Sequence, residues 1–305
     1  MEIKTVSIIG LGALGILFGG HLSRRIPKED LRIVADSERI SKYRRDGVFC
    51  NGELCSFNYV SPDEPVRPAD LLIIAVKCGG LTAAIEEAKN QVGSETVIIS
   101  LLNGISSEEI IGRTFGMDKV LYSVAQGMDA IRVGNSLTYK NMGIVCFGTA
   151  LPDDSGEKVE AVRRFFEKTS LPHEVVPDMR RKLWSKFMLN VGVNQVSAVF
   201  GYDYGAICET GPAKEMMISA MKEVLLLSDK EKVPLKETDI DYWLRVLDGL
   251  DPRGKPSMLQ DIEAKRHSEV ELFSGTVLEL GGKHGISFPV NQLLYDKIKA
   301  IESTF

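Results

Sequence analysis

A lysine and two asparagines recur at four-residue intervals in an apolar stretch of the chain. Lys186, Asn190 and Asn194 stand at i, i+4 and i+8 among residues such as Phe187 and Val191. On a helix this spacing places the three side chains on one face. Asparagine is a poor helix former, and a buried amide without a partner costs roughly 1–3 kcal/mol. The pattern favours a lysine and two amides that converge on a polar ligand over a purely structural polar ladder between helices.

A glycine-rich turn joins the first apolar run, residues 6–9, to a predicted helix. It has the pattern G-x-G-x-x-G and consists of Gly10, Leu11, Gly12, Ala13, Leu14 and Gly15. In such a turn the first glycine permits a tight bend and the second lets the backbone approach a pyrophosphate. The third allows close helix packing, and the helix N-terminus attracts the anion. We predict dinucleotide binding here, rather than a tight turn without a ligand.

Asp36 ends the second apolar run, residues 31–35. A carboxylate at this place accepts hydrogen bonds from the ribose hydroxyls of NAD and repels the 2′-phosphate of NADP. Arg39, Arg44 and Arg45 are close in sequence and could offset that repulsion, although a solvated helix face is the simpler interpretation of these arginines. The residues alone therefore leave both NAD(H) and NADP(H) open.

Two further polar residues follow apolar runs. Lys77 comes directly after residues 71–76, and Asn103, with Gly104, comes after residues 96–101. Ligands of open α/β sheets bind at the carboxyl ends of the strands. A solvated loop and ordinary turn chemistry are the alternatives, but both positions fall at the same predicted edge as the glycine turn.

Strand-like and helical stretches alternate in the first half of the chain. The four runs above predict buried parallel strands, with helices between them at 13–25, 80–91 and 106–115 and more strands at 120–125 and 144–147. From about residue 177 onward the pattern is helical, over 180–200, 210–232, 238–248, 257–282 and 290–303. We predict an α/β Rossmann domain over residues 1–177 and an all-α domain over residues 178–305.

Composition excludes several classes of function. The 305 residues carry a net charge of −5, which argues against general nucleic-acid binding. Five cysteines without a C-x-x-C pair indicate free thiols in a reducing cytosol, and four scattered histidines give no support to a metal site. The apolar stretch 6–20 is too short and too glycine-rich to span a membrane.

Ser257 opens the helix predicted over 257–282. Together with Gln260 it fits a capping box, and the serine could cap the helix and bind a ligand at once. Glu269 lies three turns further along the same predicted helix and, taken alone, would be an ordinary surface acid.

Together these segments resemble the ketopantoate reductase family, the 2-dehydropantoate 2-reductases. The resemblance covers nearly the whole chain and rests on I-I-G-L-G-A-L-G, V-K, L-N-G, L-W-S-K-F-M-L-N-V-G-V-N and S-M-L-Q-D-I-E-A-K-R-H-S-E-V-E. It implies a Rossmann domain followed by an all-helical domain like that of 6-phosphogluconate dehydrogenase. It also implies a cytoplasmic monomer or homodimer that reduces 2-dehydropantoate, a 2-keto acid, to pantoate with NADP(H) on the route to pantothenate and coenzyme A.

The resemblance also assigns roles to single residues. It implies that Lys186 is the general acid and that the substrate is bound by Asn103, Asn190, Asn194 and Ser257. For the cofactor it implies, besides the glycine turn, contacts from Lys77, Asn103, the backbone of Ala130 and, near the nicotinamide end, Glu269.

Three positions depart from the family pattern. Asp36 stands where an arginine is common, Gln195 where a proline usually follows the asparagine, and Tyr204 where a further substrate asparagine is often found. Two other functions therefore remain open. One is a related dehydrogenase that acts on another 2-keto or hydroxy acid. The other is a non-catalytic NADPH-binding sensor, which would have no need of Lys186 and its amides.

Overall fold

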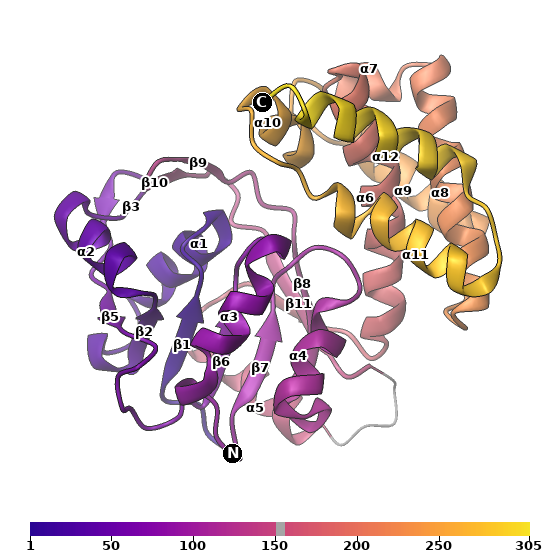
Figure 1. The fold of residues 1–305 in the computed structure, drawn as a ribbon. Helices are drawn as coiled ribbons and strands as arrows, with labels where there is room; N and C mark the ends of the chain where they lie inside the picture. The colour runs from indigo at the N-terminus through magenta and orange to yellow at the C-terminus, as the bar shows by residue number, and fades with distance from the viewer. Residues whose placement is uncertain (151–155) are drawn as a thin grey trace. The chain divides into compact units, whose positions relative to one another are not determined.

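The chain divides into two compact units. The computed structural model describes residues 1–150 and 156–305, and the units are Met1–Arg180 and Arg181–Phe305 (Figure 1). The division lies in the first turn of α6 (Met179–Phe200). Unit 1 contains a parallel-rich sheet with helices, and unit 2 is helical. The predicted fold class, a Rossmann domain followed by an all-α domain, is confirmed.

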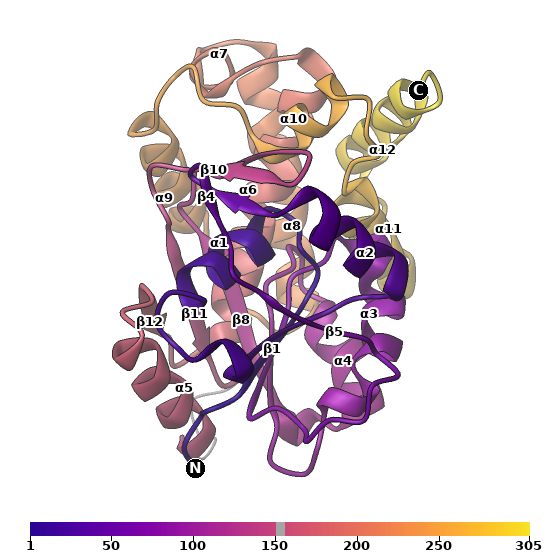
Figure 2. The same cartoon turned by 90° about the vertical axis from the view of Figure 1, so that its left-hand side faces the viewer.

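Unit 1 is built on an eight-stranded sheet. Its order is β12-β11-β8-β7-β6-β1-β2-β5, and Figure 2 shows β12, β11 and β8 side by side. The strands are β1 (Val6–Ile9), β2 (Leu31–Val34), β5 (Asn58–Val60), β6 (Leu71–Ile74), β7 (Val97–Ser100), β8 (Val120–Gln126), β11 (Ile144–Gly148) and β12 (His173–Val175). From β5 to β8 all neighbours are parallel, and β1 lies between β2 and β6. The first strand is thus central, as in a doubly wound sheet.

Helices of unit 1 cover both faces of this sheet. They are α1 (Ala13–Leu22), α2 (Ser37–Asp46), α3 (Leu81–Glu87), α4 (Ser107–Phe115) and α5 (Glu157–Lys168). Ile8 belongs to the core that includes residues of α1 and α5, whereas Ile9 belongs to the core that includes residues of α3 and α4. Successive strand side chains point to opposite faces, so the uninterrupted apolar run fills both cores.

A second, four-stranded sheet in unit 1 was not predicted. Its order is β4-β3-β10-β9, and its strands are β3 (Phe49–Cys50), β4 (Glu53–Leu54), β9 (Ile131–Val133) and β10 (Ser136–Thr138). Asn51 and Gly52 join β3 to β4 with φ of 50° and 81°. Two positive φ values are typical of the type I′ hairpin turn, for which Asn-Gly is the strongest sequence signal.

Unit 2 consists of helices that largely match the predicted ones. Besides most of α6 it contains α7 (Tyr204–Cys208), α8 (Pro212–Lys230), α9 (Glu237–Asp248), α10 (Ser257–Glu263), α11 (Ser274–His284) and α12 (Pro289–Glu302). The single helix predicted over 257–282 is wrong. The chain leaves α10 after Glu263, Lys265 adopts a positive φ of 49°, and a short 3₁₀ helix η5 (Val270–Leu272) precedes α11. Glu269 therefore lies between helices.

A buried polar cluster joins four helices of unit 2. Glu223 of α8 accepts hydrogen bonds from Val290 N at 2.9 Å and from Asn291 Nδ2 at 2.7 Å, and so caps the N-terminus of α12. Asn291 Oδ1 accepts from Ser274 Oγ at 2.9 Å, and Ser274 N donates to Gln195 Oε1 at 3.1 Å. Gln195, the departure from the usual proline, thus links α6 to α11.

The features expected from composition have structural counterparts. None of the five cysteines forms a disulfide among the described residues, and Cys50, Cys55 and Cys146 are buried. Within residues 1–150 and 156–305, no helix has both the length and the hydropathy that crossing a bilayer would require.

One carboxyl group is buried at the start of α4. Glu108 is 1% exposed. Ser107 Oγ donates to Glu108 Oε2 at 2.9 Å, and Ser100 Oγ, at the end of β7, donates to Ser107 Oγ at 2.9 Å. Glu108 Oε1 has no hydrogen-bond partner in the described part of the chain. Burial raises the pKa of Glu108 to about 7.

We expect Glu108→Gln to remove a pH dependence from the stability of the protein. The pKa of Glu108 is raised from 4.5 in the folded state, so folding favours the protonated form. The resulting stability is present below about pH 4.5 and is lost as the pH rises through about 7. The loss is on the order of 3 kcal/mol. Urea unfolding at several pH values measures it.

The exposed neighbour Glu109 supplies the matched control, Glu109→Gln. Between about pH 5 and about pH 8, the wild type and the Glu109 variant should lose stability relative to Glu108→Gln. Parallel pH profiles for the wild type and Glu108→Gln would show that Glu108 is ionised in both folded and unfolded chains.

Candidate functional site

The glycine turn packs tightly where two of its three glycines lie. A Cβ on Gly10, whose φ is +95°, would stand 2.7 Å from the Ala75 carbonyl oxygen. A Cβ on Gly15 would stand 1.8 Å from the Gly10 carbonyl oxygen. The fold therefore demands glycine at both positions, because α1 approaches β1 and the end of β6 too closely for a side chain.

Gly12 is different, because nothing inside the protein excludes a side chain there. Its Cβ would meet only the Ala75 carbonyl oxygen at 3.6 Å, which is an ordinary contact, and its φ is −74°. Gly12 is also the N-cap of α1, where no side chain caps the helix and the first turn has no acidic residue. The free space and the uncapped N–H groups fit the close approach of an anion such as a pyrophosphate.

The remaining predicted residues of unit 1 follow neighbouring parallel strands. Asp36 comes after β2, and Lys77, which is the N-cap of the short 3₁₀ helix η2 (Cys78–Gly80), comes after β6. Asn103 lies in the loop after β7, and it is half-buried. Because β2, β1, β6 and β7 are adjacent, the structure brings these residues to the same edge as the glycine turn. Ala130 lies between β8 and β9 and packs against the core.

Asp36 has a structural role as well as its predicted one. It is the N-cap of α2, and its Oδ1 accepts a hydrogen bond from Arg39 N at 2.7 Å. Its Oδ2 lies 3.3 Å from Arg39 Nε, and Arg39 also lies 3.8 Å from Glu87 Oε1. Arg45 instead pairs with Asp46 at 2.7 Å. Of the nearby arginines, Arg39 is therefore the cation beside the Asp36 carboxylate.

In unit 2, three of the predicted substrate residues form one chain of hydrogen bonds. Asn194 Nδ2 donates to Asn190 Oδ1 at 3.1 Å. Asn194 Oδ1 accepts from Ser257 Oγ at 3.2 Å and from Met258 N at 3.2 Å. Asn190 and Asn194 are each 7% exposed, and half-buried Lys186 lies one turn before Asn190 on α6. The structure thus brings together residues 63 positions apart in the chain.

This arrangement corrects the predicted capping box. Ser257 is the first residue of α10 and makes no capping hydrogen bond, while Gln260 Nε2 donates to the Lys255 carbonyl at 2.9 Å. Asn194 takes the capping role from another helix. Both ends of its amide are committed inside the protein, whereas the Asn190 Nδ2 group lies outside the hydrogen-bonded chain. No local pattern predicts the contact between Asn194 and the start of α10, because it spans 64 residues of the chain.

Glu269 is also placed differently from its prediction. It is half-buried and precedes η5, in the segment between α10 and α11, instead of lying on a long helix. Over the described ranges, no group of three or more His, Cys, Asp or Glu side chains is arranged to hold a metal ion.

Two family models match this chain and together cover most of it. "Ketopantoate reductase PanE/ApbA" matches residues 6–150, and "Ketopantoate reductase PanE/ApbA C terminal" matches residues 178–302. The chain belongs to the ketopantoate reductase PanE/ApbA family. The resemblance predicted from the motifs is confirmed, and membership identifies the protein as an oxidoreductase.

Relatives of this family member are similar over their full length but distant. The 2-dehydropantoate 2-reductase of Aquifex aeolicus is 26% identical over 97% of this chain and 96% of its own. The structure of a PanE/ApbA family ketopantoate reductase from Ralstonia eutropha has a TM-score of 0.85 at 23% identity and covers 98% of this chain and 99% of its own. That of a D-mandelate dehydrogenase with NADH has a TM-score of 0.88 at 20% identity, with 99% of each chain covered. These structures support the fold.

We expect alanine substitutions to separate the glycines that the fold requires from the one that a ligand requires. Gly15→Ala should destabilise the protein by about 1–3 kcal/mol or more, because its Cβ cannot fit. Gly12→Ala should leave the melting temperature nearly unchanged and weaken dinucleotide binding about tenfold or more, roughly 1.4 kcal/mol. Thermal unfolding and a titration with a reduced dinucleotide measure the two effects. Unchanged binding in Gly12→Ala would contradict a pyrophosphate at this turn.

Proposed function

We propose that this protein reduces the ketone of a branched 2-keto acid to the 2-hydroxy acid with NAD(P)H, and that 2-dehydropantoate is the substrate. The observation that carries the proposal is the chain of hydrogen bonds through Asn190, Asn194 and Ser257, which begins one turn from Lys186 on a buried helix. A serine, two amides and a lysine in one place suit a small polar anion with a carbonyl group. The Aquifex aeolicus relative, a 2-dehydropantoate 2-reductase, supports this choice.

Unit 1 fits the dinucleotide. The glycine turn and the N-terminus of α1 would hold the pyrophosphate, because the absence of a side chain at Gly12 leaves space that no other part of the turn fills. Asp36 and Arg39 would face the adenosine ribose, and further contacts would come from Lys77, Asn103 and the backbone of Ala130. Glu269 of unit 2 would add a contact near the nicotinamide end. When bound, the reduced nicotinamide supplies a hydride to the ketone carbon.

Residues of unit 2, together with Asn103 of unit 1, would supply the proton and orient the substrate. Lys186 would donate a proton to the ketone oxygen and stabilise the negative charge that develops there. Its charge would also attract the substrate carboxylate. Asn103, Asn190, Asn194 and Ser257 would bind the polar groups of the substrate. Asn194 also fixes Asn190 and Ser257, because it bonds to both. Such orientation can account for several kcal/mol of the barrier.

Tyr204 supports a second candidate, a related dehydrogenase of another 2-keto acid. Tyr204 N donates to the Gly254 carbonyl at 2.9 Å, and a Cβ on Gly254 would lie 3.0 Å from the Tyr204 ring. Burial raises the pKa of the Tyr204 phenol. A largely apolar ring stands near the segment that leads into Ser257, where the family often has an amide. That change favours a less polar substrate side chain.

We expect steady oxidation of NADPH or NADH when the protein meets 2-dehydropantoate, and a loss of roughly 10²–10⁴-fold in kcat for Lys186→Ala. Cofactor binding should persist in the variant. The test is a panel of 2-keto acids assayed with each cofactor, and Lys222→Ala, an exposed lysine on α8, is the control.

The possible results of the panel separate the candidates. Turnover that is faster with another 2-keto acid than with 2-dehydropantoate would identify the related dehydrogenase. Cofactor binding without turnover on any substrate would identify the sensor. A loss below about tenfold in Lys186→Ala would move the acid role to another group, with Lys77 next.

We propose NADPH as the cofactor, with Arg39 as the partner of its 2′-phosphate. Asp36→Asn keeps an acceptor for the helix cap and removes the charge, so it should leave NADPH binding unharmed or improve it. Arg39→Ala should weaken NADPH binding more than NADH binding. Titration of both cofactors against both variants measures this, and Arg45→Ala, which removes an arginine already paired with Asp46, is the control. Weaker NADH binding in Asp36→Asn would instead assign the carboxylate to the ribose hydroxyls of NADH.

A further inference from the structure

The segment between α10 and α11 carries Glu269, and hydrogen bonds hold it on both sides of that residue. The segment runs from residue 264 to residue 273 and contains only the short helix η5. At its beginning, Arg266 Nε donates to Asp261 Oδ1 of α10 at 2.9 Å. Backbone hydrogen bonds, such as those from Arg266 N to the Asp261 carbonyl and from Leu272 N to the Glu269 carbonyl, both at 2.9 Å, hold part of the segment. Side-chain contacts hold the residues between them.

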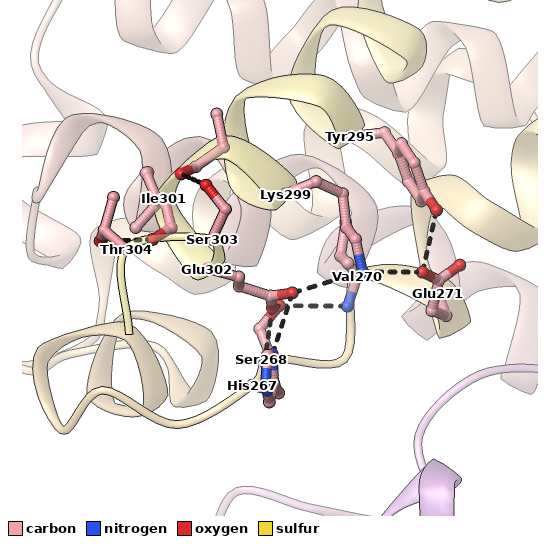
Figure 3. Close-up of polar contacts among 11 residues, drawn as sticks. His267, Ser268, Val270, Glu271, Tyr295, Lys299, Ile301, Glu302, Ser303 and Thr304 are labelled. Atoms are coloured by element: carbon pink, nitrogen blue, oxygen red, sulfur yellow. Dashed lines mark hydrogen bonds and ion pairs between the residues drawn. The ribbon is translucent and has the colours of Figure 1, made fainter.

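The strongest of these contacts joins Ser268 to the last turn of α12. Glu302 Oε1 accepts from Ser268 N at 2.7 Å and from Ser268 Oγ at 2.6 Å (Figure 3). Ser268 Oγ also accepts from Val270 N at 3.3 Å. Ser268 and Val270 flank Glu269 directly. The carboxylate therefore holds the backbone before Glu269 and, through the Ser268 hydroxyl, the backbone after it.

Glu302 is buried although it is charged. Its side chain is 4% exposed, and its Oε2 lies 3.4 Å from His267 Nδ1 and 3.5 Å from Lys299 Nζ. Burial alone would raise the pKa of Glu302, but the hydrogen bonds from Ser268, together with His267 and Lys299, hold that pKa below its ordinary value. A buried carboxylate is costly unless it is fully paired. An apolar side chain would close the end of α12 at a lower cost, so packing does not explain the carboxylate.

A second contact to α12 is exposed and provides a comparison. Glu271 Oε1 accepts from Tyr295 OH at 2.9 Å and from Lys299 Nζ at 3.2 Å (Figure 3). The Glu271 side chain is 57% exposed and that of Lys299 is 44% exposed. Exposed pairs of this kind contribute little because water screens them.

We propose that Glu302, acting through Ser268, is the positioning residue that holds Glu269 in place for the nicotinamide end of the cofactor. The proposal rests on the function proposed above, in which Glu269 contacts that end. It assigns the last turn of α12 a part in cofactor binding. Glu302 itself touches neither reactant.

The test uses Ser268→Ala and Glu302→Leu, which remove the donor and the acceptor, with Ser268→Thr as the conservative rescue and Tyr295→Phe as the control. The Kd for NADPH, from the fluorescence of the reduced nicotinamide, should rise about tenfold in the first two variants. The Kd for NADPH should equal the wild-type value in Ser268→Thr, which keeps a hydroxyl at this position. It should also be unchanged in Tyr295→Phe. Melting temperatures are measured in parallel, because a merely structural contact would lower the melting temperature and leave the Kd unchanged.

A double-mutant cycle shows whether the effect passes through Glu269. In a Glu269→Ala background, Ser268→Ala should add no further rise in the Kd. Additive effects would overturn the proposal, as would an unchanged Kd in both Ser268→Ala and Glu302→Leu. Failure of the proposed function would be seen in the wild-type protein. A wild type that binds cofactor but reduces no 2-keto acid would overturn the proposed function alone. A wild type that binds neither cofactor would overturn the positioning role as well.

Discussion

Buried polar side chains must keep their hydrogen bonds, and this requirement fixes the packing of unit 2. On helix α6, Asn194 bonds to Asn190 and to the start of α10, and Gln195 bonds to the start of α11. A shift of α6 by one residue would leave at least one of these amides unpaired, at a cost of roughly 1–3 kcal/mol each. The polar residues therefore specify the rotation and the level of the helix, which apolar packing alone would leave less defined.

The same requirement holds the side chains of the candidate site in place. Asn194 is held by the start of α10, and in return it fixes Ser257 and Asn190. Glu223 in turn fixes the start of α12, the helix that ends at Glu302. Each charged or amide group thus serves as a cap or a link for a helix other than its own. Asn190 and Ser257, which are proposed to bind the substrate, are held in one arrangement by these hydrogen bonds.

The sequence predicted best what depends on neighbours along the chain. The glycine turn, the central strands and the shared face of Lys186, Asn190 and Asn194 follow from local spacing, and the fold class follows from their alternation. It predicted worst what depends on distant partners. The bond from Ser257 to Asn194 spans 63 residues, and no local pattern contains it. The break after Glu263 was missed because apolar residues continue at helical spacing through it. The Asn51-Gly52 dipeptide, by contrast, is a local pattern typical of a hairpin turn, and it is the one local feature that predicts part of the second sheet.

The fold itself requires some of the glycines and amides of this chain and leaves others without an internal role. Gly10 and Gly15 are needed because a Cβ would collide with backbone. Gly12 occupies an ordinary conformation with room for a side chain, so the fold does not explain it. In the same way, Gln195 accepts a hydrogen bond from Ser274 N inside the protein. The oxygen of the Asn190 amide accepts from Asn194, whereas its nitrogen takes no part in that chain of hydrogen bonds. Residues of the second kind need an explanation outside the protein, and the proposed pyrophosphate and the proposed substrate would supply one for each.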